Sequence, residues 1–120
     1  MKLNIDIGGG AIYSQIMDRM RRAIIRGEWG RGEQVLPVRD MAIEIGVNPN
    51  TVARAYAELE REGILVSKRG MGTFVTEDKD RIEAEKERLA LQYVERFSKE
   101  VNELGISKSN IKKLLSKIIK

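Results

Sequence analysis

The stretch that decides the fold is Gly46–Gly63, GVNPNTVARAYAELEREG. Asn48 followed by Pro49 is typical of a helix start, because an asparagine side chain can cap the first turn and proline suits the first helical position. A glycine such as Gly63 is a common stop just beyond a helix. The stretch therefore predicts a helix from Pro49 to about Glu62.

The wheel of this helix divides into two faces. The inward face is apolar and consists of Val52, Ala55, Tyr56 and Leu59. The opposite face is small, polar or basic and consists of Asn50, Ala53, Arg54, Ala57 and Arg61. Small side chains let a backbone approach base edges, asparagine can pair with adenine, and arginine can pair with guanine. The pattern predicts a helix presented to DNA, with a solvated face and an Arg54–Glu58 pair as the alternative.

Two helices precede this stretch. A pattern of apolar residues at four-residue steps, beginning at Ile12, predicts a helix over residues 11–26. A shorter helix is expected from about Pro37 to Ile45, ended by Gly46. A helix, a tight turn and a second helix then follow one another, which is the order of a helix-turn-helix.

The period changes after Gly63. The runs ILVSK (64–68) and TFVTE (73–77) are rich in β-branched residues and flank the glycine-bearing tip RGMG. They predict a β-hairpin. Three helices followed by a hairpin is the order of the winged helix-turn-helix, so we expect a mainly α fold with a small β-hairpin. Residues 1–76 are the expected DNA-binding domain.

Residues 77–120 predict a C-terminal two-helix tail, with a long helix to about Leu104 and a last amphipathic helix after Gly105. Two helices are too few to cover their own apolar stripes, so a second copy of the chain is the natural cover and we expect a homodimer. The predicted dimer interface consists of Leu89, Tyr93, Phe97, Val101, Leu104, Ile111, Leu114, Leu115 and Ile118.

Composition excludes several classes of protein. The 120 residues contain neither cysteine nor histidine, so disulfides, thiolate metal sites and histidine-based catalysis are excluded. Glu58, Glu60 and Glu62 indicate a solvated helix face rather than an active site, so we expect no enzyme and no cofactor. No apolar run is long enough to cross a membrane and the start lacks a signal-peptide core, so a cytoplasmic protein is expected.

Charge alone does not predict DNA binding. The formal net charge is +4, but residues 28–76 carry six basic and seven acidic side chains. DNA recognition by this segment must therefore depend on the direction in which its charges point.

The order VNPNTVARAYAELEREGIL (47–65) and RGMGTFV (69–75) resembles the DNA-binding domain of GntR-type bacterial transcription regulators, over about residues 32–75. The short tail resembles the two-helix dimerisation tail of the YtrA subfamily. The resemblance implies a homodimeric repressor that binds a palindromic operator in double-stranded DNA, often controlling its own operon and transporter genes.

The resemblance also implies DNA contacts at the start of the second helix, at the start of the third helix and at the wing. Together with the outward face of the third helix and the charged hairpin tip, the predicted DNA-binding residues are Arg39, Asn48, Asn50, Thr51, Ala53, Arg54, Lys68, Arg69, Gly70 and Gly72. Two positions depart from the family pattern. Pro37 stands where a serine normally caps the second helix, which leaves Asp40 to take over part of the capping. Many members have arginine where Ala53 stands, so a different base preference is expected.

Three alternatives remain open. The winged helix could be a protein-interaction module without sequence-specific DNA binding, and Asn48 is explained equally well by capping alone. A small-molecule effector could bind between the tail helices, near Tyr93 and Phe97. A carboxylate metal site is not excluded by composition.

Overall fold

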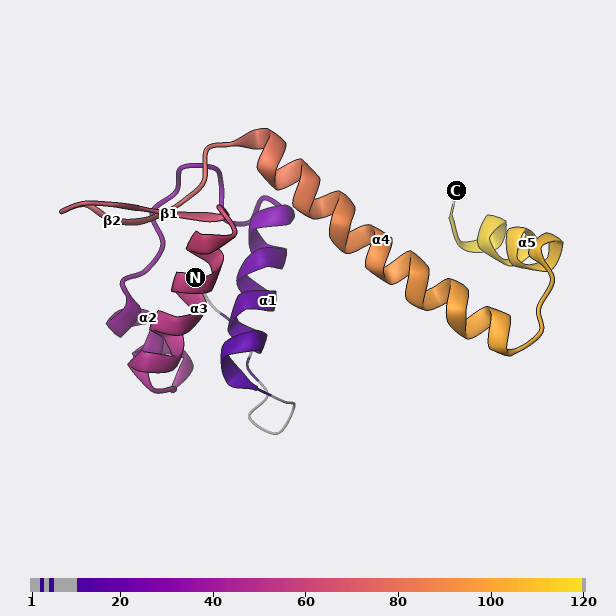
Figure 1. Cartoon of the computed structure of the whole chain (residues 1–120), viewed down its shortest axis with the longest axis horizontal. Helices are drawn as coiled ribbons and strands as arrows, with labels where there is room; N and C mark the ends of the chain where they lie inside the picture. The colour runs from indigo at the N-terminus through magenta and orange to yellow at the C-terminus, as the bar shows by residue number, and fades with distance from the viewer. Residues whose placement is uncertain (1–2, 4, 6–10, 120) are drawn as a thin grey trace. The chain divides into compact units, whose positions relative to one another are not determined.

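The computed structural model describes residues 3, 5 and 11–119, and it divides into two compact units (Figure 1). The first unit extends to Glu85 and the second begins at Lys86. The first unit therefore continues past the junction at residues 76 and 77 that the sequence predicts, and it includes the start of the long helix of the tail.

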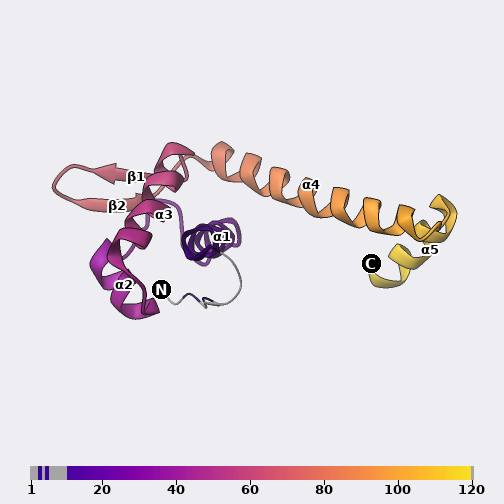
Figure 2. The ribbon, with the colours of Figure 1, turned by 60° about the horizontal axis from the view of Figure 1, so that its bottom comes forward.

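The first unit contains three helices and a hairpin, as predicted. The helices are α1 (Ile12–Ile25), α2 (Val38–Ile45) and α3 (Pro49–Arg61), and the strands are β1 (Leu65–Lys68) and β2 (Gly72–Val75). In both views the hairpin extends away from the three helices (Figures 1 and 2). The fold is a mainly helical winged helix-turn-helix, which confirms the predicted fold class.

The turn between α2 and α3 is built by short-range contacts. Gly46 ends α2 with φ 72° and ψ 38°, a left-handed conformation that glycine adopts without strain. The side-chain oxygen of Asn48 accepts a hydrogen bond from the backbone N–H of Asn50 at 2.8 Å, which caps α3. The turn is therefore specified by residues that lie within it.

The start of α2 differs from the prediction. Pro37 has an extended conformation, with φ −55° and ψ 152°, and is the residue before the helix rather than its first residue. Within the described residues no side chain caps α2, so the expectation that Asp40 replaces a capping serine is wrong. Asp40 instead contributes a negative charge to the first turn, where it interacts favourably with the helix dipole.

The core of the first unit lies among the three helices and the base of the hairpin. The inward face predicted for α3 is confirmed, because Val52, Ala55, Tyr56 and Leu59 are all buried. The strands pair antiparallel from Leu65 with Val75 to Lys68 with Gly72. The segment before α2 also joins β2, since the Val35 N–H donates to the Thr73 carbonyl at 2.9 Å. The hairpin is thereby attached to the helices at its base.

A network of charged side chains attaches the beginning of α4 (Lys79–Glu103) to α1 and to the end of α3. Glu85 is 1% exposed, and its carboxylate contacts Arg21 at 3.0 Å and Arg81 at 3.2 Å. Arg21 also binds both carboxylate oxygens of Glu62, at 2.7 and 2.8 Å. Arg81 donates to the backbone carbonyl of Glu62 at 2.8 Å. This cluster explains why the first turns of α4 belong to the first unit.

The second unit consists of the remainder of α4 and α5 (Lys108–Ile118). The chain reverses at Gly105, which has φ 71°, and Ser107 caps α5 by accepting a hydrogen bond from the Asn110 N–H at 3.2 Å. None of the described residues from 86 to 119 is buried. The tail thus forms the two predicted helices but has no core of its own.

Candidate nucleic-acid interface

The outward face of α3 is exposed over its whole length. Its five members are Asn50, Ala53, Arg54, Ala57 and Arg61, and every one of them is exposed. Because α3 is a regular helix with its opposite face in the core, this surface is continuous and free of large apolar side chains. It has the small and polar character that the floor of a major groove can accommodate.

Arg54 does not make the surface pair that was the alternative to a DNA contact. Glu58 binds Arg61 instead, with a distance of 3.0 Å between nitrogen and oxygen. The guanidinium carbon of Arg54 lies 3.7 Å from the centroid of the Tyr13 ring on α1. The alternative of an Arg54–Glu58 pair is therefore wrong, and the sequence pattern did not reveal the partner that Arg54 has.

The start of α3 combines a cap with exposed polar groups. The Asn48 side-chain oxygen is engaged by the backbone of Asn50, as the capping interpretation predicts. Thr51 is half-buried, and Asn48 and Asn50 are exposed. The first backbone N–H groups of a helix favour an anion, so this end of α3 suits a DNA phosphate. Arg39, in the first turn of α2, is also exposed.

The wing presents two cations at an exposed tip. Lys68 lies over the ring of Phe74, with its ammonium nitrogen 4.6 Å from the ring centroid, and Arg69 is exposed. Gly70 has φ 75° and Gly72 has φ 114°. These positive φ values explain why glycine stands at both positions, whether or not the two residues approach DNA.

Gln34 supports the wing, and sequence reasoning missed it. Its side-chain amide donates to the Met71 carbonyl at 2.9 Å, and a Cβ atom added at Gly72 would lie 2.7 Å from the same amide nitrogen. The two residues are far apart in the chain and no local pattern links them. The tip of the hairpin is consequently held by a residue from the loop before α2.

Tyr56 fixes the loop that precedes α2. Its hydroxyl donates to the Leu36 carbonyl at 2.7 Å, and the residue is 4% exposed. Burial, with further contributions from the charges of Asp40 and Glu44, raises the pKa of Tyr56 well above its usual range. The hydroxyl therefore stays protonated and remains a hydrogen-bond donor at all ordinary pH values.

The glutamates of α3 and the glutamate that follows it are all engaged in structural contacts. Glu58 binds Arg61, Glu62 binds Arg21, and Glu60 accepts a hydrogen bond from the hydroxyl of Ser67. In the described part of the chain, no group of three acidic side chains is arranged to hold a metal ion. Among the same residues, no helix has the length and apolar character needed to cross a membrane.

The tail carries an apolar surface on both of its helices. The nine residues predicted for the dimer interface are exposed or half-buried in the single chain. Several of them line an apolar groove of about 320 Å³ between α4 and α5, namely Phe97, Val101, Ile111, Leu114, Leu115 and Ile118. Other large apolar side chains of the tail are also exposed, and the sequence prediction did not include them, namely Leu91, Val94 and Ile119.

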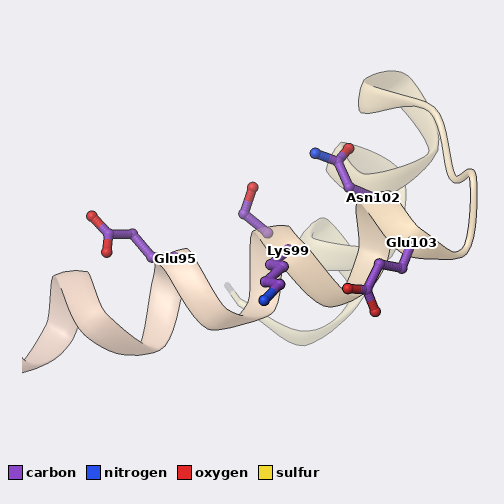
Figure 3. Close-up of a pocket in the computed structure, with 5 residues that line it drawn as sticks. Glu95, Lys99, Asn102 and Glu103 are labelled. Carbon is purple, nitrogen blue, oxygen red and sulfur yellow. The ribbon is translucent and has the colours of Figure 1, made fainter.

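A second hollow in the tail is polar. It has a volume of about 480 Å³ and is lined from α4 by Glu95, Ser98, Lys99, Asn102 and Glu103 (Figure 3). Its acidic and basic side chains come from a single helix and are exposed. We interpret this hollow as the solvated side of α4.

Comparison with known proteins agrees with this geometry. The family model of bacterial regulatory proteins of the gntR family matches residues 12–75. The chain is 40% identical over 100 residues to the HTH-type transcriptional regulator YhcF of Bacillus subtilis, and the match covers 83% of each chain. It is 45% identical over 67 residues to the HTH-type transcriptional repressor YtrA of the same organism, covering 56% of this chain and 52% of YtrA.

A solved structure extends the similarity into the tail. The GntR family transcriptional regulator from Listeria monocytogenes has a TM-score of 0.85 and 40% identity, and the match covers 92% of this chain and 96% of that one. The similarity to this structure thus includes both the winged helix and the two-helix tail. The chain belongs to the GntR family of bacterial regulatory proteins, is similar to YhcF and YtrA in having a short helical tail, and is a DNA-binding transcription regulator rather than an enzyme.

Proposed function

We propose that this regulator is a repressor that binds a palindromic operator as a homodimer, with α3 reading the major groove of each half-site. The observation that carries the proposal is the exposed face of α3, which is small, polar and basic and is followed at once by a wing with two cations at its tip. Helix and wing are the two elements with which winged helices contact a duplex.

The proposed contacts fall into two groups. Asn50, Ala53 and Arg54 lie in the first two turns of α3, and we assign them to base edges because the N-terminal residues of a recognition helix contact the bases. Arg39, Asn48, Thr51 and the wing residues Lys68, Arg69, Gly70 and Gly72 are assigned to the phosphate backbone. Backbone contacts set the register of the protein, and base contacts set the sequence.

The tail supports a dimer. Large apolar side chains are exposed along α4 and α5, including Leu91, Val94 and Leu114 at half of their surface or more. A small molecule in the groove between the helices would leave most of that surface in water, whereas the same surface on a second chain would cover it. We therefore assign the groove to the partner chain rather than to an effector. YtrA, to which the chain is similar, is a transcriptional repressor, and this similarity supports repression as the sign of regulation.

The experiment is selection of bound duplexes from a random library by the full chain. We expect an inverted repeat with half-site centres about 10–10.5 bp apart or a multiple of that spacing, because two α3 helices must enter successive major grooves. Binding should weaken with added salt. Placing the selected site over a promoter should lower transcription in vitro. If no sequence is enriched, or retention does not respond to salt, a protein-interaction module becomes the better explanation.

Substitutions in the proposed interface sharpen this test. We expect Arg39→Ala and Arg54→Ala each to weaken operator binding while leaving the circular dichroism spectrum unchanged, since both side chains are exposed. Loss of a base-edge pair costs about 1–3 kcal/mol and relaxes the preference at one position, whereas loss of a phosphate contact weakens all sequences alike. Arg26→Ala is the matched control, because it removes the same charge at the opposite end of α1 from Tyr13. Operator affinity that responds equally to all three substitutions would contradict the assignment.

A further inference from the structure

Tyr13 and Arg54 form a contact between α1 and α3 at the edge of the proposed DNA-binding face. The guanidinium carbon of Arg54 lies 3.7 Å from the centroid of the Tyr13 ring, so the cation sits over the face of the ring. Tyr13 lies in the first turn of α1 and is half-buried, while Arg54 lies in the second turn of α3 and is exposed. The ring is thus held by the packed helix and the cation is open to solvent.

The contact leaves the hydrogen-bonding capacity of Arg54 unused. A guanidinium group carries five N–H donors, and its charge can lie over an aromatic ring while those donors stay available to acceptors. Within the described residues Arg54 makes no hydrogen bond or ion pair, and the neighbouring carboxylate of Glu58 is bound to Arg61 at 3.0 Å. The donors at the edge of the guanidinium therefore remain available to an acceptor from outside the chain.

We propose that Tyr13 is a positioning residue for operator recognition, which holds the guanidinium of Arg54 in place before DNA arrives. The inference rests on the proposed function and adds a residue outside the helix-turn-helix to the recognition surface. An unsupported arginine side chain samples many rotamers and loses that freedom when it binds. A ring that holds the cation beforehand reduces this loss, and a cation–π contact at an exposed site corresponds to roughly a two- to fivefold change in an equilibrium constant.

A double-mutant cycle on the full chain tests the inference. The variants are Tyr13→Leu, which keeps apolar volume for packing but removes the ring, Tyr13→Phe, which keeps the ring, Arg54→Ala, and the double variant Tyr13→Leu with Arg54→Ala. The probe is the labelled duplex selected by the wild-type chain, titrated by fluorescence anisotropy. Thermal melting of each variant establishes that it is folded.

We expect Tyr13→Leu to bind the operator about two- to fivefold more weakly and Tyr13→Phe to bind as the wild type does. In the Arg54→Ala background, Tyr13→Leu should have no further effect, because Tyr13 acts through Arg54. An equal loss in both backgrounds, an Arg54→Ala variant that binds normally, or tighter binding by Tyr13→Leu would each overturn the inference. A wild-type chain that selects no duplex would overturn the proposed function and this inference together, whereas a wild-type operator that Tyr13→Leu binds unchanged would overturn this inference alone.

Discussion

The two units of the chain differ in where their apolar side chains lie. Every buried apolar side chain in the described residues belongs to the first unit, from Ile16 on α1 to Ile82 at the start of α4. The second unit has two well-formed helices, but none of its described residues is buried and large apolar side chains are exposed on both helices. Three helices and a hairpin can enclose a core, and two helices cannot. The first unit therefore buries its apolar side chains within a single chain, whereas the tail leaves apolar surface uncovered.

The largest expected effect concerns the exposed apolar surface of the second unit. Phe97→Glu adds a charge to the apolar groove, where a dimer would bury it without a partner, so the dimer should dissociate. Tethering makes the second half-site contact intramolecular, and its loss should lower apparent operator affinity by about 10²–10⁴. Analytical ultracentrifugation and operator titration measure the two effects.

The matched control for Phe97→Glu is Ser98→Glu, which adds the same charge to the neighbouring residue on the polar side of α4. This variant should remain dimeric and bind the operator as the wild type does. The comparison of the two units fails if Phe97→Glu sediments as a dimer, or if Ser98→Glu dissociates to the same extent.

The next largest effect concerns the buried charged network of the first unit. Glu85→Ala removes the buried carboxylate that Arg21 and Arg81 share and leaves buried positive charge only partly compensated. We expect the free energy of unfolding to fall by on the order of 3 kcal/mol. Glu83→Ala, at an exposed position on the same turn of α4, should have an effect near zero. Urea unfolding followed by circular dichroism distinguishes the two, and equal losses would show that the charged network does not attach α4 to the first unit.

The smallest effect concerns the hydrogen bond between Tyr56 and the Leu36 carbonyl. Tyr56→Phe should lower the free energy of unfolding at neutral pH by about 0.5–1.5 kcal/mol, because a carbonyl loses its partner. The pKa of Tyr56 is raised in the folded chain. The hydroxyl therefore contributes fully to the free energy of unfolding below about pH 10, and this contribution is lost as the pH rises further.

The difference in unfolding free energy between the wild type and Tyr56→Phe should therefore narrow above that pH. The same measurements on Tyr13→Phe, which alters a half-buried tyrosine, provide the reference. A difference between wild type and Tyr56→Phe that does not change from pH 7 to pH 11 would contradict the assigned role of the hydroxyl.

Much of the first unit could be predicted from the sequence because its signals are local. The four-residue apolar steps of α1, the cap and proline at the start of α3, and the glycine-bearing tip between two β-rich runs each specify an element without reference to the rest of the chain. The wheel of α3 also predicted correctly which side chains are buried and which are exposed. The start of α2 is not specified by its local sequence, because Pro37 suits both the position before a helix and its first residue.

The contacts that support the candidate site were decided by tertiary structure. Nothing local distinguishes Glu85, which is buried between two arginines, from the exposed Glu83 two residues earlier. In the same way, no pattern in the sequence connects Tyr13 with Arg54. A helical period tells which face of each helix is apolar, but the packing of one helix on another determines which side chains meet across the boundary. The amino-acid sequence by itself therefore determined the elements, their faces and the family, and only the folded chain decided how the proposed recognition surface is held.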